Sequence, residues 1–464
     1  MATTTERLNE VAVVPQKRRA RVFKLALPAV GEQVLNTFVG LADTFLIGNL
    51  SFAAATTLGY TGTDALNGVG LANQMVWLVT VLFAAVGVGA TAIVARSRGA
   101  RDMQTANQAL KQSLLLGLLL GFVAMALTYL LAPAAMQLLG AAPEIQPLGV
   151  SFLRIAALAF VPTALLFLGT AVLRGVGDTR TPLFVMLGVN VVNIAICLLL
   201  INGNAGFPAL GVEGAAIGAA VARGGGGIVI VLLLLRGRSG LKLDLDLRPQ
   251  WDMIKRIARI GMPSGGEQLV FQGALLVFVT FVTGLGKPAY AAHNVVLNIE
   301  SLSFLPGMGY AIAASTLVGQ SLGSGKPEEA QADAYEAQWQ GVIMMTVLGA
   351  FMVLFPRQLI GLFTHDPAVQ AAGEMPMRLA GLFQPLLAIN FIMSGALRGA
   401  GETRWPLYTK LISTWGIRLP LVMLLLHWGF GLTGVWIGMT ADFGVQAALA
   451  WWRFKQGRWK TLRV

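Results

Sequence analysis

Long runs of apolar residues, separated by short stretches of polar residues, glycine and proline, make up most of the chain. A helix that crosses about 30 Å of hydrocarbon at about 1.5 Å per residue needs roughly 20 such residues. The pattern predicts twelve transmembrane helices, over 25–49, 64–95, 107–131, 146–174, 181–202, 211–235, 253–284, 289–320, 337–362, 369–397, 405–428 and 431–453. The expected fold class is therefore an all-α integral membrane protein.

The composition agrees with this pattern. Of the 464 residues, 55% are hydrophobic and only 12% are charged, which is a far more apolar balance than soluble proteins have. Cys197 is the single cysteine, so neither a disulfide nor a cysteine-based metal site can form within the chain. Helix packing must therefore hold the fold together without either kind of bond.

The basic residues predict how the chain is oriented. With both termini on one side, that face holds 28 of the 34 lysines and arginines, and the opposite face holds Lys287 and Arg357. Because cytoplasmic loops are rich in lysine and arginine, we expect residues 1–24 and 454–464 to be cytoplasmic tails of a protein in the inner cell membrane. The net charge of +12 is then explained by the orientation of the protein in the membrane. Binding to nucleic acid would need a basic soluble domain, and the sequence predicts none, so no nucleic-acid partner is expected.

Two stretches of the sequence are duplicated. LRGVGDTRTPL at 173–183 returns as LRGAGETRWPL at 397–407, at an offset of 224 residues. PAVGEQV at 28–34 returns as PSGGEQL at 263–269, at an offset of 235 residues. Internal repeats of this kind are typical of transporters built from two related halves.

The duplication predicts two six-helix lobes, at 25–235 and 253–453, joined by a cytoplasmic loop at 236–252. Six is an even number of crossings, so both lobes start on the same side of the membrane and are related as parallel repeats. Two parallel lobes with a cleft between them suit transport by alternating access.

The duplicated LRGxG[DE]TRxP loops resemble those of the multidrug and toxic compound extrusion family. So do GLANQ…VGATAIVARSRGARD at 70–102, AAHNVVLNIESLSFLPGMGYAIAASTLVGQSLGSG at 291–325 and GVEGAAIGAAVAR at 211–223. The DinF-like branch is the most similar, and the resemblance covers the chain outside the two tails. It implies export of small organic compounds, often cationic and amphipathic, in exchange for protons or sodium. The ion gradient is then the energy source and no cofactor is expected.

Charged residues at matching positions in both halves most simply serve the architecture that the halves share. Five pairs match at one of the two offsets, namely Arg154 and Arg378, Arg174 and Arg398, Asp178 and Glu402, Arg180 and Arg404, and Glu32 and Glu267. We expect these residues to cap helix ends and to form salt bridges that fix the inner loops.

Asp43, in contrast, is not duplicated, because the matching position in the second half is Phe278. On the predicted fifth helix, Asn190, Asn193 and Cys197 are spaced three and four residues apart and form one stripe. Counting about 1.5 Å per residue from the inner helix ends places Asp43 and Asn193 at similar depths, roughly 22 and 20 Å. A lone acid in a span is by default functional, so we predict that Asp43 and this stripe form a cation-coupling site.

The family resemblance bears on which ion this site uses. In the family the stripe commonly ends in a second acid, where Cys197 stands here, and the next helix often supplies a threonine, where Ala219 stands. Sodium needs several oxygen ligands, and a thiol is a poor substitute. Proton coupling at Asp43 is therefore favoured over sodium, with a sodium site completed by backbone carbonyls or water as the alternative.

A second set of unduplicated polar residues lies in the C-terminal half. Arg418 and Asp442 stand at comparable depth on consecutive predicted helices. They either neutralise each other or form a second ion or substrate site together with Glu300. His293, at the start of the predicted eighth helix, is interpreted as an interfacial or capping residue.

The N-terminal half contains a further unduplicated charge, Arg223, followed by four glycines at 224–227. Each glycine weakens a helix by about 1 kcal/mol relative to alanine. The run indicates either a hinge or a close contact between helices, and the sequence leaves both open.

Aromatic side chains are candidates for lining an adaptable cleft, because their faces attract organic cations. The candidate substrate residues are Trp77, Phe278, Phe304, Phe383 and Trp415.

These features together predict a secondary active exporter of organic cations that works as a cation antiporter. The alternative within transport is a flippase for lipid-linked precursors, which needs a strongly cationic cavity and hence Arg154 and Arg378 facing the cleft. A membrane-embedded enzyme or receptor is less favoured. The chain has only three histidines, no P-loop GxxxxGK[ST] and no clustered metal ligands, and its duplication has no evident use in a receptor.

Overall fold

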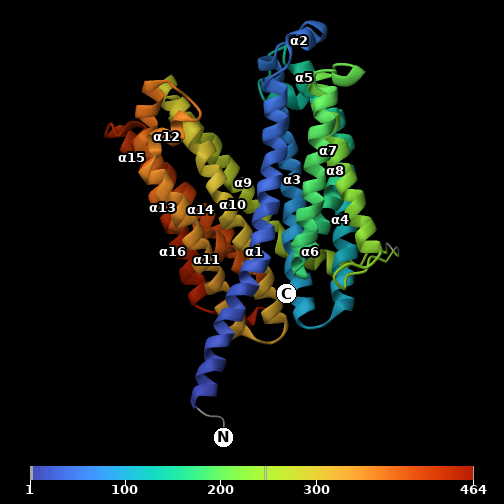
Figure 1. Ribbon diagram of the computed structural model, residues 1–464, viewed down its shortest axis with the longest axis vertical. Helices are drawn as coiled ribbons and strands as arrows, with labels where there is room; N and C mark the ends of the chain where they lie inside the picture. The colour runs from blue at the N-terminus through green and yellow to red at the C-terminus, as the bar shows by residue number, and fades with distance from the viewer. Residues whose placement is uncertain (1–3, 245, 247, 463–464) are drawn as a thin grey trace. The chain divides into compact units, whose positions relative to one another are not determined.

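The computed structural model describes residues 4–244, 246 and 248–462. In this part of the chain the secondary structure is helical throughout, apart from one isolated β-bridge between Arg238 and Leu241 (Figure 1). The helices are α1 Thr4–Gly48, α2 Phe52–Leu58, α3 Gly62–Gly99, α4 Met103–Leu138, α5 Gln146–Leu158, α6 Phe160–Gly175, α7 Arg180–Leu200, α8 Gly211–Leu235, α9 Trp251–Thr283, α10 Lys287–Gly323, α11 Pro327–Leu354, α12 Pro356–Gly361, α13 Pro367–Gly399, α14 Arg404–Ser413, α15 Leu419–His427 and α16 Gly431–Lys455. Short 3-10 turns lie at Asn204–Gly206 (η1) and Arg458–Thr461 (η3), and a π-helical turn lies at Thr414–Arg418 (η2).

The helices are long and apolar enough for a membrane protein. Among the described residues, ten helices could cross a membrane by length and composition. The number is eleven if α5 and α6, which are bent by 56° relative to each other, form one span. Pro162 explains the break, because its nitrogen has no hydrogen to donate to the carbonyl of Leu158. The all-α membrane class is confirmed, and the count of twelve spans stays a prediction.

Two helices begin well before the predicted spans. α1 begins at Thr4, so the predicted cytoplasmic tail is helical over most of its length. α11 begins at Pro327, ten residues before the predicted start at 337, with a proline in its first turn. An apolarity criterion ends a span where charged residues begin, but glutamate, lysine and arginine are good helix formers and continue the helix into a polar environment.

The chain divides into two compact units. The N-unit comprises Gly31–Val94 and Asp102–Gly261. The C-unit comprises Met1–Val30, Ala95–Arg101 and Met262–Val464. The predicted lobes follow the chain without interruption, whereas the first part of α1, the last five residues of α3 and the turn after it are grouped with the C-unit.

Glycines set the packing in the N-unit, where α8 packs against α6 and α7. The helix α8 runs unbroken through its four glycines. A Cβ atom on Gly227 would lie 2.1 Å from the carbonyl oxygen of Pro162, and one on Gly226 would lie 2.6 Å from the side chain of Val189. Of the two alternatives for the glycine run, the close helix contact is thus present.

The C-unit is built mainly from α10, α11, α13 and α16, which pack against one another. A Cβ atom on Gly399 of α13 would lie 2.1 Å from the carbonyl oxygen of Ser315 on α10. These two helices therefore touch through their backbones, which leaves little freedom in the positions of the polar side chains that they carry.

Candidate functional site

Asp43 lies near the end of α1 and is partly buried in the N-unit. Its Oδ1 accepts a hydrogen bond of 2.7 Å from Nδ2 of Asn193. The thiol of Cys197 donates to the same oxygen at 3.5 Å. Asn193 and Cys197 lie one turn apart on α7 and both are fully buried. Three of the four residues predicted to form one site are thus in contact.

Asn190, the fourth residue, has different partners. Its Nδ2 donates to the carbonyl oxygens of Leu35 at 3.0 Å and Met186 at 2.9 Å. Its Oδ1 has no hydrogen-bond partner within the described residues. The hydrogen bonds of Asn190 therefore tie α7 to the backbone of α1 and do not reach Asp43. The stripe was predicted from spacing alone, which does not show that Asn190 meets the carbonyl of Leu35, about two turns before Asp43 on α1.

Arg223 of α8 is the residue that the sequence analysis did not group with Asp43. It is partly buried, and its positive charge interacts with Asp43. In the sequence, Arg223 stands out as a lone arginine in an apolar span. Its proximity to Asp43 cannot be predicted without knowing how α8 packs against the rest of the N-unit.

Gly218 explains how α8 comes close to this site. A Cβ atom on it would lie 2.5 Å from Sγ of Cys197 and 3.4 Å from Oδ1 of Asn193. Any larger residue at this position would displace the side chains that donate to Asp43. The site is therefore held between α1, α7 and α8 by close packing.

Arg418 and Asp442 form a buried ion pair in the C-unit. Nη2 of Arg418 lies 2.6 Å from Oδ2 of Asp442, and their side chains are 3% and 0% exposed. Asp442 also accepts hydrogen bonds from Gln446 at 2.7 Å and from Thr414 at 3.3 Å. The neutralising pair that the sequence allowed is present.

A π-helical turn carries Arg418. This turn, Thr414–Arg418, lies between α14 and α15 and is followed by Pro420. The missing N–H of Pro420 leaves the carbonyl of Gly416 without its regular partner, which favours a local change of helix type. Such π-helical turns are frequent at functional sites.

Glu300 and His293 lie on α10 and are 2% and 1% exposed. Oε2 of Glu300 and both ring nitrogens of His293 have no hydrogen-bond partner in the described part of the chain. The interpretation of His293 as an interfacial or capping residue is wrong. Because α10 begins at Lys287, His293 already lies inside the helix, where its ring packs 5.6 Å from Phe278 and 5.7 Å from Trp436.

The candidate cleft residues differ in exposure. Trp77 is 37% exposed and Trp415 is 42% exposed. Phe304 and Phe383 are partly buried, and Phe304 packs edge to face on Phe391 at 5.6 Å. Phe278 is 1% exposed, with the guanidinium of Arg418 5.7 Å from its ring centre. Phe278 is therefore a core residue of the C-unit. This position differs from the sequence prediction, which placed Phe278 in a substrate cleft.

The duplicated charges form matching salt bridges. Arg174 lies 2.5 Å from Glu32 in the N-unit, and Arg398 lies 2.8 Å from Glu267 in the C-unit. Both acids and both arginines are related by the offsets found in the sequence, so the predicted structural role of these four residues is confirmed as ion pairs.

The other duplicated charges have separate partners. Glu402 pairs with Arg453 at 2.5 Å. Arg378 pairs with Glu374 at 2.8 Å, and the guanidinium of Arg154 lies 5.4 Å from the ring centre of Tyr129. Arg180 and Arg404 are the first residues of α7 and α14.

Asp178, in the turn between α6 and α7, anchors the start of the predicted inter-lobe loop. Burial raises the pKa of its carboxyl. Hydrogen bonds from Ser239 at 2.6 Å and from the backbone and hydroxyl of Thr181, together with the charge of Arg238, outweigh this effect. The pKa therefore lies below its ordinary value of 3.8. The loop is thus tied to the N-unit by an ionised carboxylate at neutral pH.

The sequence is similar to those of known multidrug resistance proteins over almost its whole length. The family model MatE matches residues 28–199 and 263–424. The probable multidrug resistance protein NorM of Thermotoga maritima is 35% identical over 457 residues, which cover 97% of this chain and 95% of that protein. The multidrug resistance protein NorM of Burkholderia vietnamiensis is 29% identical over 442 residues, covering 93% and 92% of the two chains.

Solved structures show the same fold. A crystal structure of MATE in the bent conformation superposes with a TM-score of 0.86 and 24% sequence identity, over 95% of each chain. At 24% identity this similarity shows that the fold is shared, but it does not identify a substrate.

Proposed function

Because the chain belongs to the multidrug and toxic compound extrusion family, whose members are transporters and not enzymes, we propose that it exports small organic compounds, chiefly cations, by secondary active transport. The names of its NorM relatives as multidrug resistance proteins support export of drugs. Twelve spans in two lobes, with both termini cytoplasmic in the inner membrane, are the architecture that we propose for it. Transport would proceed by alternating access, in which a substrate site opens to each side of the membrane in turn.

The coupling ion that we propose is the proton, and the observation that carries this is the set of groups around Asp43. Its Oδ1 receives an N–H of Asn193 and the thiol of Cys197, which are hydrogen donors and not cation ligands. Donors of this kind hold an ionised carboxylate in place without contributing oxygens to a metal ion. A proton needs only the carboxylate itself.

Sodium coupling fits this arrangement less well. Sodium binds through several oxygens, while a thiol is a weak ligand for so hard a cation. The positive charge of Arg223 also interacts with Asp43 and would repel a second cation there.

In the cycle that we propose, Asp43 alternates between its charged and neutral forms. Protonation from the outside releases the bound organic cation, and deprotonation inside resets the N-unit. Each charge moved gains about 2.3 kcal/mol per 100 mV of membrane potential. Trp77 and Trp415, which are exposed, are the aromatic residues that we assign first to the substrate cleft, followed by Phe304 and Phe383.

The second polar cluster supports a separate role in the C-unit. The pair of Arg418 and Asp442 is buried in the C-unit. Glu300 is buried in the same unit, and its Oε2 has no hydrogen-bond partner within the described chain. A buried carboxylate oxygen without a partner favours a group that binds a proton or a ligand during the cycle. We propose this cluster as an accessory ion or substrate site.

The geometry does not favour the flippase alternative. A cavity for phosphates needs several uncompensated positive charges. Arg378 and Arg418 are instead paired with acids, at 2.8 Å and 2.6 Å. Arg154 lies over an aromatic ring, where a guanidinium gains a cation–π contact.

Proteoliposomes containing the purified protein test the proposal. A fluorescent organic cation should move against its gradient when a pH gradient is imposed at equal sodium on both sides. A sodium gradient without a pH gradient should drive no comparable movement. Robust transport under the sodium gradient alone would contradict proton coupling, and no movement under either gradient would contradict export.

A further inference from the structure

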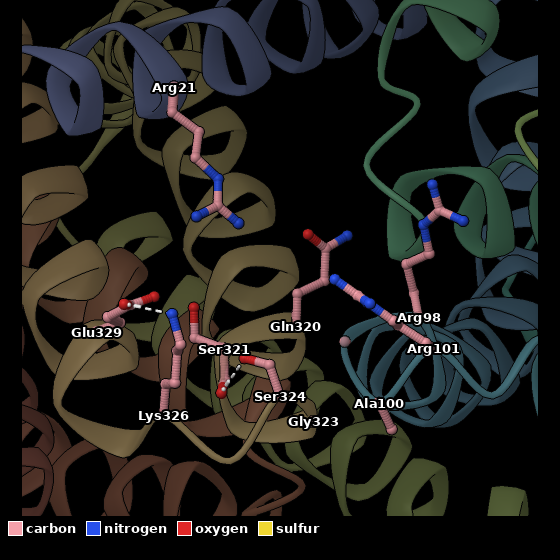
Figure 2. A pocket seen from close by; sticks show the side chains of 11 residues that line it. Arg21, Arg98, Ala100, Arg101, Gln320, Ser321, Gly323, Ser324, Lys326 and Glu329 are labelled. Carbon is pink, nitrogen blue, oxygen red and sulfur yellow. Dashed lines mark hydrogen bonds and ion pairs between the residues drawn. The ribbon is translucent and has the colours of Figure 1, made fainter.

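Basic side chains line a cavity of about 610 Å³ in the C-unit (Figure 2). Arg21 enters it from α1 and Arg98 from the last turn of α3. Arg101 follows in the turn after α3, and Lys326 lies between α10 and α11. Ligand pockets generally measure about 300–1,000 Å³, so the space suffices for a small anionic group.

The lining of this basic cavity has an excess of positive charge. Glu329 is the single acid among its lining residues, and it forms an ion pair of 2.9 Å with Lys326. Gln320 and Ser324 add neutral hydrogen-bonding groups. Even with Asp333 paired to Arg21 beside the cavity, the basic residues outnumber the acids, which favours an anion.

The side chains of the basic cavity converge from different helices. Figure 2 shows the guanidinium of Arg21 pointing down from α1 and that of Arg101 reaching toward the side chain of Gln320. Arg101 has a backbone φ of 59°, in the left-handed region that few residues other than glycine adopt. This backbone conformation sets the direction in which the Arg101 side chain leaves the turn.

The floor of the basic cavity is rigid, because the ends of α3 and α10 touch through their backbones. A Cβ atom on Gly99 would lie 1.9 Å from the carbonyl oxygen of Gln320. One on Gly323 would lie 2.0 Å from the carbonyl oxygen of Arg96. The positions from which Arg98, Arg101 and Lys326 extend are therefore preorganised, which lowers the entropy lost on binding a ligand.

A buried acid holds Arg21 in place above the cavity. Asp333 of α11 lies 3.7 Å from Arg21 and 3.3 Å from Arg18, and it accepts a hydrogen bond of 3.1 Å from Ser321. Asp333 itself does not line the cavity. The ion pair thus attaches α1 to α11 and leaves Arg21 at the cavity wall.

Helix capping explains only part of this basic cluster. Arg98 stands in the last turn of α3, where the helix dipole favours a cation without any ligand. Arg21 lies within α1, away from a helix C-terminus, and the side chain of Arg101, which follows the end of α3, extends toward Gln320 of α10. Arg21 and Lys326 each have a carboxylate partner, Asp333 and Glu329, and they keep further N–H donors that an anion can share with Arg101.

Phosphate is the anion that this set of side chains recognises best, since guanidinium groups bind it through paired N–H donors. We propose that the basic cavity binds a phosphate group. An anionic phospholipid headgroup and soluble inorganic phosphate both present this chemistry. The cavity lies where the apolar helices α3 and α10 end and α11 begins, the level at which lipid phosphates flank the hydrocarbon core, and this favours the headgroup. Assignment to the cytoplasmic leaflet rests on the proposed orientation, whereas the binding does not.

The test uses the full-length protein in detergent, with Arg101→Gln and Arg101→Gln/Lys326→Gln as variants. Arg236→Gln removes an exposed cation at the end of α8, outside the cavity, and is the matched control. Binding of phosphatidylglycerol and of phosphatidylcholine is measured by native mass spectrometry. Thermal unfolding is followed in sodium phosphate and in sodium chloride at equal ionic strength, so that screening is constant.

We expect phosphatidylglycerol to bind more tightly than phosphatidylcholine, with an affinity about fivefold lower for each cavity cation removed and unchanged in Arg236→Gln. Stabilisation by inorganic phosphate over chloride, lost in Arg101→Gln, without a preference between the lipids would support the site with a soluble source. Equal binding of both lipids and no effect of inorganic phosphate, in the unmodified protein and the variants alike, would overturn the proposal.

Discussion

The side-chain amide of Asn193 on α7 donates a hydrogen bond of 2.7 Å to Oδ1 of Asp43 on α1. This contact joins two residues that are 150 positions apart in the chain. It restrains an acid whose matching position in the second half is Phe278. Since the bond needs only an acceptor oxygen on residue 43, the charge of this residue can be removed while the contact is kept.

Asp43→Asn should reduce pH-driven export to the background of empty liposomes and leave expression largely intact. The new side chain can still accept the hydrogen bond of Asn193 through its own Oδ1, but it cannot exchange a proton. Transport of a fluorescent cation into acid-loaded proteoliposomes measures the effect. Asp64→Asn, in the first turn of α3, is the control and should transport normally. Normal export by Asp43→Asn would remove Asp43 from the coupling mechanism.

Cys197→Asp should create or strengthen a response to sodium. Its carboxylate would stand where Sγ lies 3.5 Å from Oδ1 of Asp43 and 3.8 Å from Oδ1 of Asn193, so three oxygens could share one cation. Without a cation the two carboxylates repel each other. We therefore expect sodium chloride to raise the unfolding temperature of this variant more than potassium chloride does.

Cys197→Ala is the control for this experiment, because it removes the thiol and adds no ligand. It should show no difference between sodium and potassium. A clear sodium-specific rise in the unfolding temperature of the unmodified protein would indicate that a sodium site already exists.

Glu32→Ala should destabilise the protein more than it changes ion dependence. Glu32 is 2% exposed and lies 2.5 Å from Arg174. Removing one partner of a buried ion pair typically costs about 3–5 kcal/mol, because the remaining charge loses its compensation. Glu267→Ala should cost less, since the side chain of Glu267 is 13% exposed.

Thermal unfolding in detergent, alongside transport assays, separates the two effects of Glu32→Ala. The double variant Glu32→Ala/Arg174→Met should recover part of the lost stability, because no unpaired charge is left behind. A fully stable Glu32→Ala protein with an altered ion dependence would refute the structural role.

The link between Asp178 and the loop at Arg238 and Ser239 should weaken in acid. The folded-state pKa of Asp178 is depressed below 3.8, so its ionised form contributes stability above the ordinary pKa. That contribution is lost as the pH falls through the depressed value. Hydrogen exchange of the loop amides, measured between pH 6 and about pH 3 and corrected for the intrinsic rate, should show lower protection at the acid end. Asp178→Asn should lower protection at all pH values and abolish the pH dependence.

Length and apolarity alone determined the class of this protein, since the bilayer imposes a fixed thickness on every span and excludes unpaired backbone groups. The bounds predicted for the helix at 211–235 match α8 residue for residue. The duplicated motifs also predicted that Glu32, Arg174, Glu267 and Arg398 have structural roles, and the structure then paired Glu32 with Arg174 and Glu267 with Arg398. A repeat shows that two charges serve a shared architecture before any contact is known.

Only the tertiary structure decided which side chains meet. Residue spacing places Asn190 and Asn193 on one stripe of α7, yet Asn193 donates to Asp43 while Asn190 donates to a carbonyl of α1. Arg223 lies within electrostatic range of Asp43, and His293 is buried, because the rotation and depth of α8 and α10 determine what each residue faces. Spacing along one helix records a shared face, whereas the partner of that face depends on packing between helices that are far apart in the sequence.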